Sequence, residues 1–485
     1  MATADPIAIF PAAEQGAVAA LARHLALTLK GGEVIRLEGP LGAGKTHFAR
    51  ALVRALLDNP CEDVPSPSFT LVQTYDLLSG GSLWHVDLYR LDGSEGTAEL
   101  GLDDAGPDDI SLIEWPDRLG PAPMGALTIS LQPVPQAPDL REVTLSGDAV
   151  RWGPAARAAE CAQLAARAGW ADARVEPLAG DASARRYLRL TLPQGSAVLM
   201  DAAPGSCGPY LHMTDWLRSR GFHAPEVLAA DTARGLLLLE DLGDNLLARA
   251  IDAQPALAQP AYLRVADLLA ALHREPPAPE ILALDGRELA QQVGLFDEWY
   301  APAVGAALGA AAQVGPAIAE LHAALAKAQP PVTALRDFHA ENIVWRGDAP
   351  LGLLDFQDAV AAHPAYDLVS ALQDPRRDVP PEIEAAAIAR YCQQTGTDPD
   401  EFAAAYALLG AQRNLRIMGI FTRLCLRDAK PRYLAFMPRC WGLIARNLAH
   451  PALAPLAEAV RAVPPPTPDL VERIAQRCGT MRESA

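Results

Sequence analysis

The chain has 485 residues, more than one ordinary domain holds, so we expect at least two domains. Half of the residues are hydrophobic and the formal net charge is −18, which excludes a disordered chain and argues against a broad nucleic-acid-binding surface, because such a surface needs clustered Lys and Arg. The seven cysteines form no CxxC pair and no cluster with histidine at zinc spacing, so we expect buried thiols in a reducing compartment.

The N-terminus does not resemble a targeting segment. Residues 1–15 lack a basic stretch followed by an apolar core, and no later run approaches the roughly 18 apolar residues that a membrane span requires. We therefore expect a cytoplasmic protein.

The first predicted elements are a strand, a glycine-rich turn and a helix. Residues 33–37 form a short apolar run, and residues 47–57 have helical periodicity. Between them, GPLGAGKT matches G-x-x-x-x-G-K-[ST] at every fixed position. In this motif backbone N–H groups surround the phosphates, the lysine reaches the β- and γ-phosphates, and the hydroxyl is a ligand of Mg²⁺. The predicted ATP-binding residues of the turn are Gly39, Gly42, Gly44, Lys45 and Thr46, with Thr46 also a metal ligand.

Further apolar runs complete a small twisted α/β sheet near Gly147. They cover residues 82–91, 110–116, 126–132 and 141–147. Asp87 and Glu114 end the first two of these strands. A carboxylate in such a place supports Mg²⁺ through water or positions the water that attacks ATP, although either acid alone is also typical of a solvated strand end.

Four motifs occur in a fixed order, namely GPLGAGKT, SPSFTLV, HVDLYRL and IEWP. Together they resemble the TsaE-type ATPases, over residues 7–147. That family is the ATPase subunit of the bacterial complex that adds threonylcarbamoyl to the adenosine beside the anticodon of tRNA. The resemblance implies ATP, Mg²⁺ and partner proteins of the tRNA-threonylcarbamoylation complex that carry out the transfer, so the chain need not hold tRNA itself.

The resemblance also assigns roles in the first site. It implies that Asp87 supports the metal, that Glu114 is the catalytic residue of hydrolysis and that Trp115 lines the ATP site. Either Ser68 or Thr70 senses the γ-phosphate. A small nucleotide or metabolite kinase that uses the same phosphate loop is the alternative.

The second half predicts another domain behind a short linker. Residues 148–158 carry Gly and Pro with little apolar periodicity, and they separate a first domain, 1–147, from a second, 159–485. The second domain begins with a predicted helix, strands and a crossing helix, and it is helical from about residue 260. We expect a small lobe at about 159–243 and a helical lobe at about 244–485. The expected fold class is an α/β P-loop NTPase domain followed by an α+β two-lobed protein-kinase-like domain.

Two acidic motifs in the helical lobe predict phosphoryl transfer. In LRDFHAEN, Asn342 follows Asp337 by five residues, and in LLDFQDA, Asp355 ends an apolar strand 13 residues after Asn342. In kinases the first acid is the catalytic base and the other two residues bind Mg²⁺. We therefore predict Asp337 as the base, with Asn342 and Asp355 as metal ligands.

The predicted small lobe lacks the lysine that usually contacts the ATP phosphates. Met200 and Asp201 stand in its strand. The loop GDASARRY, residues 180–187, has small residues where a phosphate-covering loop belongs. The predicted ATP-binding residues here are Gly180, Ser183, Arg185 and Arg186. The alternatives are surface arginines and a regulatory pseudokinase.

Six segments resemble one kinase family, namely GDASARRY, VLMDA, LLLEDLGD, LRDFHAEN, LLDFQDAV and AYDLVS. They are similar to the AmgK-type sugar kinases of the aminoglycoside-phosphotransferase fold, over about residues 160–450. The resemblance implies phosphorylation of the anomeric hydroxyl of N-acetylmuramic acid and N-acetylglucosamine in cell-wall recycling. It implies that Glu240 lies in the interlobe hinge that borders adenine, and the missing lysine is typical of the family.

A row of arginines on a predicted helix, residues 403–428, bears on the substrate. Arg416, Arg423 and Arg427 share one helical face, with Arg413 adjoining. An anionic amino sugar tolerates arginine, whereas a polycationic aminoglycoside requires acids. A solvated face is the other interpretation, and an aminoglycoside, choline or homoserine kinase is the alternative function.

Overall fold

A computed structural model describes residues 5–91, 100–120, 123–178 and 185–481. The chain divides into two compact units. Unit 1 comprises Met1–Gly208 and Glu226–Asp241, and unit 2 comprises Pro209–Pro225 and Leu242–Ala485. Unit 1 thus contains both the predicted first domain and the sheet of the predicted small lobe.

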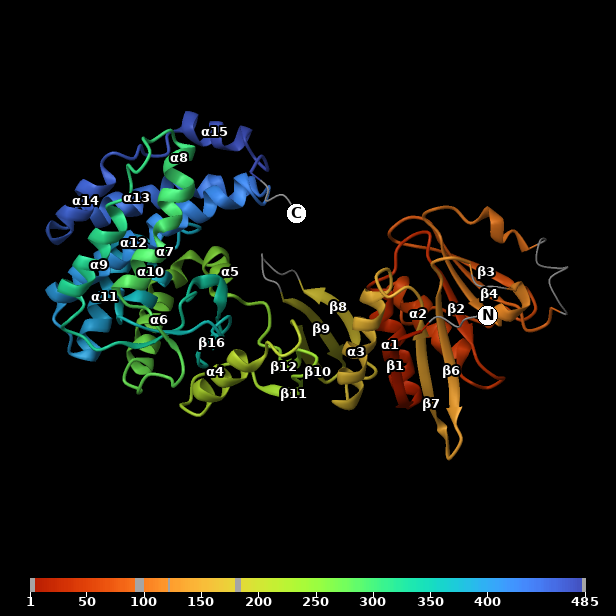
Figure 1. Ribbon diagram of the computed structural model, residues 1–485. Helices are drawn as coiled ribbons and strands as arrows, with labels where there is room; N and C mark the ends of the chain where they lie inside the picture. Colours follow the sequence, from red (N-terminus) through yellow and green to blue (C-terminus); the bar gives the residue numbers. More distant parts are fainter. Residues whose placement is uncertain (1–4, 92–99, 121–122, 179–184, 482–485) are drawn as a thin grey trace. The chain divides into compact units, whose positions relative to one another are not determined.

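A seven-stranded mixed sheet forms the first layer of unit 1 (Figure 1). In the order β1-β7-β6-β2-β5-β4-β3, its strands are Pro6–Ala13, Ala137–Ser146, Leu127–Val134, Val34–Glu38, Ile110–Glu114, Ser82–Asp87 and Val72–Asp76. Strands β6, β2, β5 and β4 run parallel, and the remaining pairs are antiparallel. The central strand β2 is buried because helices α1 (Gln15–Ala26) and α2 (Lys45–Leu56) complete the same hydrophobic core.

Helix α3 (Gly153–Arg167) joins two hydrophobic cores. Trp152, Ala155, Ala159 and Ala162 recur at helical spacing and belong to the core of the seven-stranded sheet, where α3 packs against α1. Cys161, Leu164 and Ala165 on another face belong to a second core. The helix begins inside the stretch expected to be a linker.

The second core lies under a five-stranded antiparallel sheet of order β11-β12-β10-β9-β8. Its strands are Val227–Asp231, Leu236–Glu240, Gly195–Asp201, Arg186–Leu192 and Arg174–Leu178. The crossing helix α4 (Gly208–Arg218) lies between β10 and β11 in sequence.

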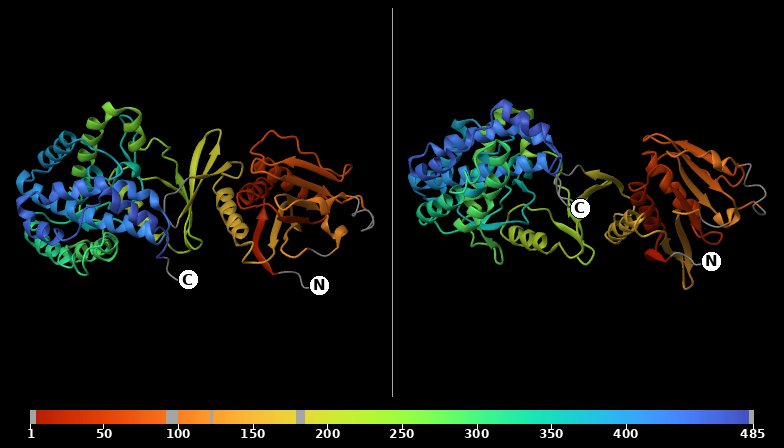
Figure 2. Two further views of the ribbon diagram at one scale, coloured as in Figure 1. Left: turned by 90° about the horizontal axis from the view of Figure 1, so that it is seen from above. Right: turned by 45° about the horizontal axis from the view of Figure 1, so that its top comes forward.

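Unit 2 consists mostly of helices (Figure 2). After α4 they are α5 (Leu247–Ala253), α6 (Ala258–Leu272), α7 (Gly286–Gln292), α8 (Ala301–Ala303), α9 (Val314–Leu325), α10 (Ala365–Leu372), α11 (Pro381–Thr395), α12 (Pro399–Leu426), α13 (Met437–Leu448), α14 (Ala454–Val460) and α15 (Pro468–Gln476), with a π-helical turn at Phe296–Tyr300. The short strands are β13 (Leu282–Ala283), β14 (Val332–Ala334), β15 (Ile343–Val344), β16 (Gly352–Leu353) and β17 (Val360–Ala362).

Helix α12 is the longest helix of unit 2, and most of its residues are buried. The Asp398 side chain caps it by accepting hydrogen bonds from the N–H groups of Asp400 and Glu401, and Pro399 takes the first helical position, where its missing N–H costs nothing. This helix runs beside α10, α13 and the loop that carries Asp337.

Two expectations from composition can be compared with the described residues. All seven cysteines are free thiols. Five are buried, as expected, whereas Cys61 is exposed and Cys478 is half-buried. In the part of the chain that the structure describes, every helix is too short or too polar to cross a bilayer.

Candidate active sites

The glycine-rich turn after β2 has the backbone geometry of a phosphate loop. Gly39 has a φ of 140°, and a Cβ at this position would lie 2.3 Å from the Leu131 carbonyl oxygen, so only glycine fits. Gly44, with a φ of 103°, precedes the first residue of α2. The turn therefore directs backbone N–H groups and the positive end of α2 at one place.

Lys45 lies folded over this turn. Its Nζ donates to the carbonyl oxygens of Gly39 (2.8 Å) and Pro40 (3.0 Å) and sits 3.6 Å from the centre of the Trp115 ring. Burial lowers the pKa of Lys45, against the opposing effect of the Glu114 and Asp87 carboxylates. A phosphate would replace the two carbonyl partners with a charged one.

The carboxylate of Glu114 is held on both oxygens. The Thr46 hydroxyl donates to Oε2 at 3.0 Å, and Nε2 of His85 lies 3.0 Å from Oε1. Glu114 is 1% exposed and His85 is fully buried. Sequence reasoning gave His85 no role, although alternation places it on the same face of β4 as Asp87.

Asp87 is the centre of a second group of hydrogen bonds. Its Oδ2 accepts from the hydroxyls of Ser66 (2.7 Å) and Ser68 (2.8 Å), and its Oδ1 accepts from the N–H of Tyr89 (3.0 Å). Thr70 is exposed. Of the two candidate γ-phosphate sensors, the structure places Ser68 beside Asp87.

The strand register explains why these acids meet. Asp87 is paired with Glu114 across β4 and β5, and Glu114 is paired with Leu37 across β5 and β2, directly before the glycine-rich turn. The carboxyl ends of parallel strands therefore bring both acids to the turn.

The donor atoms at this edge suit Mg²⁺. A hydroxyl and two buried carboxylates are hard oxygen donors, and Lys45 balances only one of the two negative charges. No three His, Cys, Asp or Glu side chains of the described residues form a metal cluster by themselves. This composition fits an ion that takes most of its ligands from phosphates and water.

In unit 2, a hairpin brings the three predicted kinase residues together. Strands β15 and β16 pair directly after Asn342 and before Asp355. The Asn342 amide donates to the Asp337 carbonyl oxygen (2.9 Å) and to Oδ2 of Asp355 (3.4 Å). Asn342 and Asp355 thus form a pair of oxygen-bearing side chains that also suits Mg²⁺.

The backbone of the Asp337 loop is strained and tightly held. Arg336 has a φ of 73°, which is unfavourable for a residue with a side chain. The buried Asp367 carboxylate accepts from the N–H groups of Leu335 (2.6 Å) and Arg336 (3.0 Å). Ser370 donates to the Arg336 carbonyl oxygen at 3.3 Å. Sequence reasoning quoted AYDLVS only as a point of resemblance and did not foresee that Asp367 holds this loop.

The remaining predicted ATP-binding residues belong to unit 1. Arg186 binds Asp201 (2.8 Å), and Arg157 donates to the other oxygen of the same carboxylate (2.8 Å). Arg185 is half-buried and also has a partner. Glu240 ends β12 and accepts from the N–H of Glu226 (3.1 Å). Two further predicted residues, Gly180 and Ser183, lie outside the described residues.

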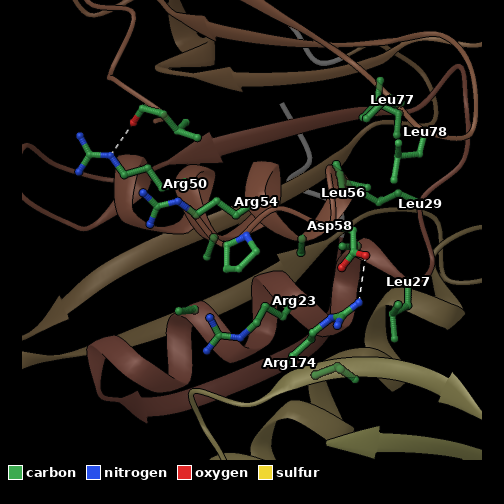
Figure 3. A pocket seen from close by; sticks show the side chains of 18 of the residues that line it. Arg23, Leu27, Leu29, Arg50, Arg54, Leu56, Asp58, Leu77, Leu78 and Arg174 are labelled. Carbon is green, nitrogen blue, oxygen red and sulfur yellow. Dashed lines mark hydrogen bonds and ion pairs between the residues drawn. The ribbon is translucent and has the colours of Figure 1, made fainter. Parts of the chain in front are cut away.

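A large cavity of unit 1 lies away from the predicted chemistry (Figure 3). Its volume is about 1380 Å³, and α1, α2 and β8 contribute to its lining. Figure 3 shows Arg23, Arg50, Arg54 and Arg174 around it, with Arg174 bound to Asp58 at 2.9 Å. None of the predicted site residues that the structure describes lines this cavity.

Comparisons with known proteins match both halves of the chain. The model of the family described as "Phosphotransferase enzyme family" matches residues 174–405, and that of "Threonylcarbamoyl adenosine biosynthesis protein TsaE" matches residues 12–140.

Among curated relatives, an N-acetylmuramate/N-acetylglucosamine kinase of Caulobacter vibrioides is 40% identical over 349 residues, which cover 62% of this chain and 94% of that protein. The kinase of the same name from Pseudomonas aeruginosa is 33% identical and covers 61% of this chain and 91% of that protein. A tRNA threonylcarbamoyladenosine biosynthesis protein TsaE of Aquifex aeolicus is 43% identical over 98 residues, which cover 20% of this chain and 68% of that protein.

Proposed function

The chain belongs to the N-acetylmuramate/N-acetylglucosamine kinase family in its C-terminal part and to the TsaE family in its N-terminal part, and on this basis we propose that it carries two ATP-dependent activities. One is ATP hydrolysis in support of threonylcarbamoylation of tRNA. The other is phosphorylation of the anomeric hydroxyl of N-acetylmuramate and N-acetylglucosamine. Both expected family resemblances and the expected fold class are confirmed.

The hydrogen-bonded row Thr46–Glu114–His85 supports the ATPase assignment. In our proposal the glycine-rich turn and Lys45 bind the phosphates, Trp115 lines the nucleotide site, and Glu114 orients and deprotonates the attacking water. Mg²⁺ held by Thr46 and Asp87 would neutralise phosphate charge. Ser68 is our choice for the γ-phosphate sensor because it bonds to Asp87.

The cluster of Asp337, Asn342 and Asp355 supports the kinase assignment. Asp337 is 48% exposed, so a sugar hydroxyl can reach it. As the hydroxyl oxygen attacks the γ-phosphorus and the bond to ADP breaks, the hydroxyl proton passes to the Asp337 carboxylate. Mg²⁺ held by Asn342 and Asp355 would shield the phosphates.

Additional ATP contacts complete the kinase proposal. We place Gly180, Ser183, Arg185 and Arg186 near the phosphates and Glu240 near adenine. Because Asp201 already binds Arg186, this arginine must exchange partners in order to contact ATP.

A substrate panel tests the kinase. Full-length protein receives ATP labelled at the γ-phosphate together with each sugar, an aminoglycoside, choline or homoserine. We expect label on the two sugars only and a loss of about 10²–10⁴-fold in kcat with Asp337→Asn, with little change in KM. Label on amino alcohols alone would refute the proposed substrate.

ATP hydrolysis without sugar tests the first activity. We expect a slow rate that rises when partner proteins of the tRNA-threonylcarbamoylation complex are added, and a loss of about 10²–10³-fold with Glu114→Gln at nearly unchanged nucleotide affinity. The two variants are matched controls, since Glu114→Gln should spare the kinase and Asp337→Asn should spare the ATPase. A free phosphorylated metabolite made by the first site would contradict its assignment.

The partners follow from the two activities. We propose proteins of the tRNA-modification complex for the N-terminal part and an amino sugar for the C-terminal part, with the tRNA held by a partner. Both reactions draw on ATP, and we place the chain in the cytoplasm.

A further inference from the structure

Three arginines surround the loop of the predicted catalytic base in unit 2. Arg336 precedes Asp337, and α12 contributes Arg413 and Arg416 at a spacing that makes them neighbours on the helix. Cations beside a kinase base can pair with a phosphate or with an anionic group of the substrate, so the partners of each arginine decide its role.

Arg413 is committed to the protein. It is 9% exposed, its guanidinium lies 3.8 Å from Oδ1 of Asp337, and it donates to the Arg336 carbonyl oxygen at 3.4 Å. It also lies over the Tyr366 ring, 5.9 Å from its centre. These contacts make Arg413 a positioning residue that holds the base and the strained backbone before it.

Arg416 is not committed in this way. It is half-buried, yet no hydrogen bond or ion pair joins its guanidinium to another residue that the structure describes. Burial lowers the pKa of Arg416, and the charges of Arg413 and Arg336 add to this effect, while Tyr366 and Asp337 oppose it. Half-burial beside two other arginines does not fit the other interpretation, in which Arg416 belongs to a solvated helix face.

A partly desolvated guanidinium without a counter-ion is unfavourable in the free protein, and an anion that arrives with the substrate removes this cost. The two sugars named for the relatives differ in one charged group, because N-acetylmuramate is N-acetylglucosamine with a lactyl ether that carries a carboxylate. The shared amino-sugar ring offers Arg416 only neutral acceptors, whereas the lactyl carboxylate offers a negative charge and a charge-assisted hydrogen bond.

We propose that Arg416 is the specificity-determining residue of the kinase and that its guanidinium binds the carboxylate of N-acetylmuramate, while Arg413 stays with the Asp337 loop as a positioning residue. This proposal rests on the proposed sugar kinase function. The carboxylate does not react, so its binding stabilises the bound substrate and the transition state equally and changes KM more than kcat.

The test compares two sugars in wild type and in Arg416→Gln. We expect the variant to raise KM for N-acetylmuramate by about 10- to 100-fold, the range of a charge-assisted hydrogen bond, with KM for N-acetylglucosamine within about twofold. Arg416→Lys keeps the charge but loses the bidentate geometry, so its KM for N-acetylmuramate should lie between the two.

The methyl ester of N-acetylmuramate completes a double-mutant cycle. Wild type should bind the neutral ester as weakly as Arg416→Gln binds the acid, and the variant with the ester should show no further loss. Arg427→Gln is the matched control, since Arg427 lies about 16 Å along the same helix and already binds Asp428 at 2.8 Å. It should leave both KM values unchanged.

The outcomes separate the two proposals. Wild type that phosphorylates neither sugar overturns the proposed function. Wild type that phosphorylates both, with Arg416→Gln weakening them equally or weakening the neutral sugar more, overturns only the carboxylate subsite. The carboxylate subsite would also be overturned if the loss of affinity caused by Arg416→Gln and the loss caused by esterification were additive.

Discussion

At the scale of single residues, motif positions in both sites acquire their geometry from side chains that no motif identifies. The apolar pattern places Glu114 at a strand end, and motif spacing places Asp337 in a catalytic loop, whereas the catalytic role of Glu114 is what the family resemblance implies. His85 contacts the Glu114 carboxylate, and Asp367 holds the loop that carries Asp337. Both come from other segments of the sequence, so these contacts are seen only in the folded chain. Partner residues of this kind are hard to predict because each is explained equally well by ordinary burial.

Changing His85 tests whether Glu114 needs its buried partner. In His85→Gln a flexible amide replaces the rigid imidazole, so the 3.0 Å contact with Glu114 weakens and the carboxylate loses its orientation. We expect ATP turnover to fall about 10-fold with nucleotide affinity unchanged, because only the positioning of the attacking water is affected. His47→Gln on α2 is the control. Equal losses in both variants would argue against a specific role.

A change at Asp367 tests the support of the kinase loop through pH. Burial raises the pKa of Asp367 from 3.8 to about 7, against the opposing effect of two backbone N–H donors. Between these two values the folded chain holds a proton that the unfolded chain has released, so the free energy of unfolding falls as pH rises.

Denaturant unfolding from pH 5 to pH 8 measures the slope of the free energy of unfolding against pH. Asp367→Asn cannot titrate and should lose this part of the slope. At pH 8, where the wild-type carboxylate accepts from both N–H groups, the variant should also be less stable because an amide has one acceptor oxygen. Asp348→Asn, an exposed change in the same unit, should leave the slope intact. An unaltered slope in Asp367→Asn would show that the carboxyl is already ionised across this range.

At the scale of elements, three strands of unit 1 that sequence reasoning missed share one position. The strands β1, β3 and β8 each lie at the edge of a sheet. Strands β1 and β8 contain proline, which an edge tolerates because one row of N–H groups has no strand partner, and β3 is mostly polar. Apolar inner strands such as β2, β5 and β6 were predicted to within about two residues of their ends, because burial inside the sheet dictates their composition.

The phosphate loop allows a sharp test of backbone geometry. In Gly39→Ala the new Cβ would lie 2.3 Å from the Leu131 carbonyl oxygen at a φ of 140°, so the turn must shift. We expect loss of nucleotide binding and a destabilisation of roughly 1–3 kcal/mol, measured by fluorescent ATP titration and denaturant unfolding. Gly80→Ala has a φ of 92° with open space around the Cβ, and it should bind nucleotide normally.

At the scale of the whole molecule, helix α3 makes the division into modules less simple than the motifs suggest. The sequence predicts a linker at 148–158 because Gly and Pro interrupt the apolar pattern there. The structure begins α3 at Gly153 and buries Trp152, whose indole N–H donates to the Gly125 carbonyl oxygen at 3.0 Å. A linker and a helix start share the same residue types, so composition alone does not separate them.

Truncation tests the contribution of α3 to the ATPase. A fragment of residues 1–147 lacks Trp152 and the alanines that pack on α1, whereas 1–170 retains them. We expect the shorter fragment to be less stable by roughly 3 kcal/mol or more in denaturant unfolding followed by circular dichroism, because a buried tryptophan is lost. Trp152→Ala in the longer fragment should fall between the two. Equal midpoints for both fragments would mean that the first core is complete without α3.

The position of α3 also imposes an order of events on the ribosome. Trp152, Ala155, Ala159 and Ala162 complete a core whose other members lie at or before Leu145. During synthesis this core cannot close until translation has passed Ala162, when the ribosome is already reading the segment that packs into the second core. A nascent chain interrupted earlier exposes the apolar face of α1 and becomes a substrate for chaperones or proteases. The ATPase therefore finishes folding only in chains that have begun to make the kinase, which ties production of one enzyme to production of the other.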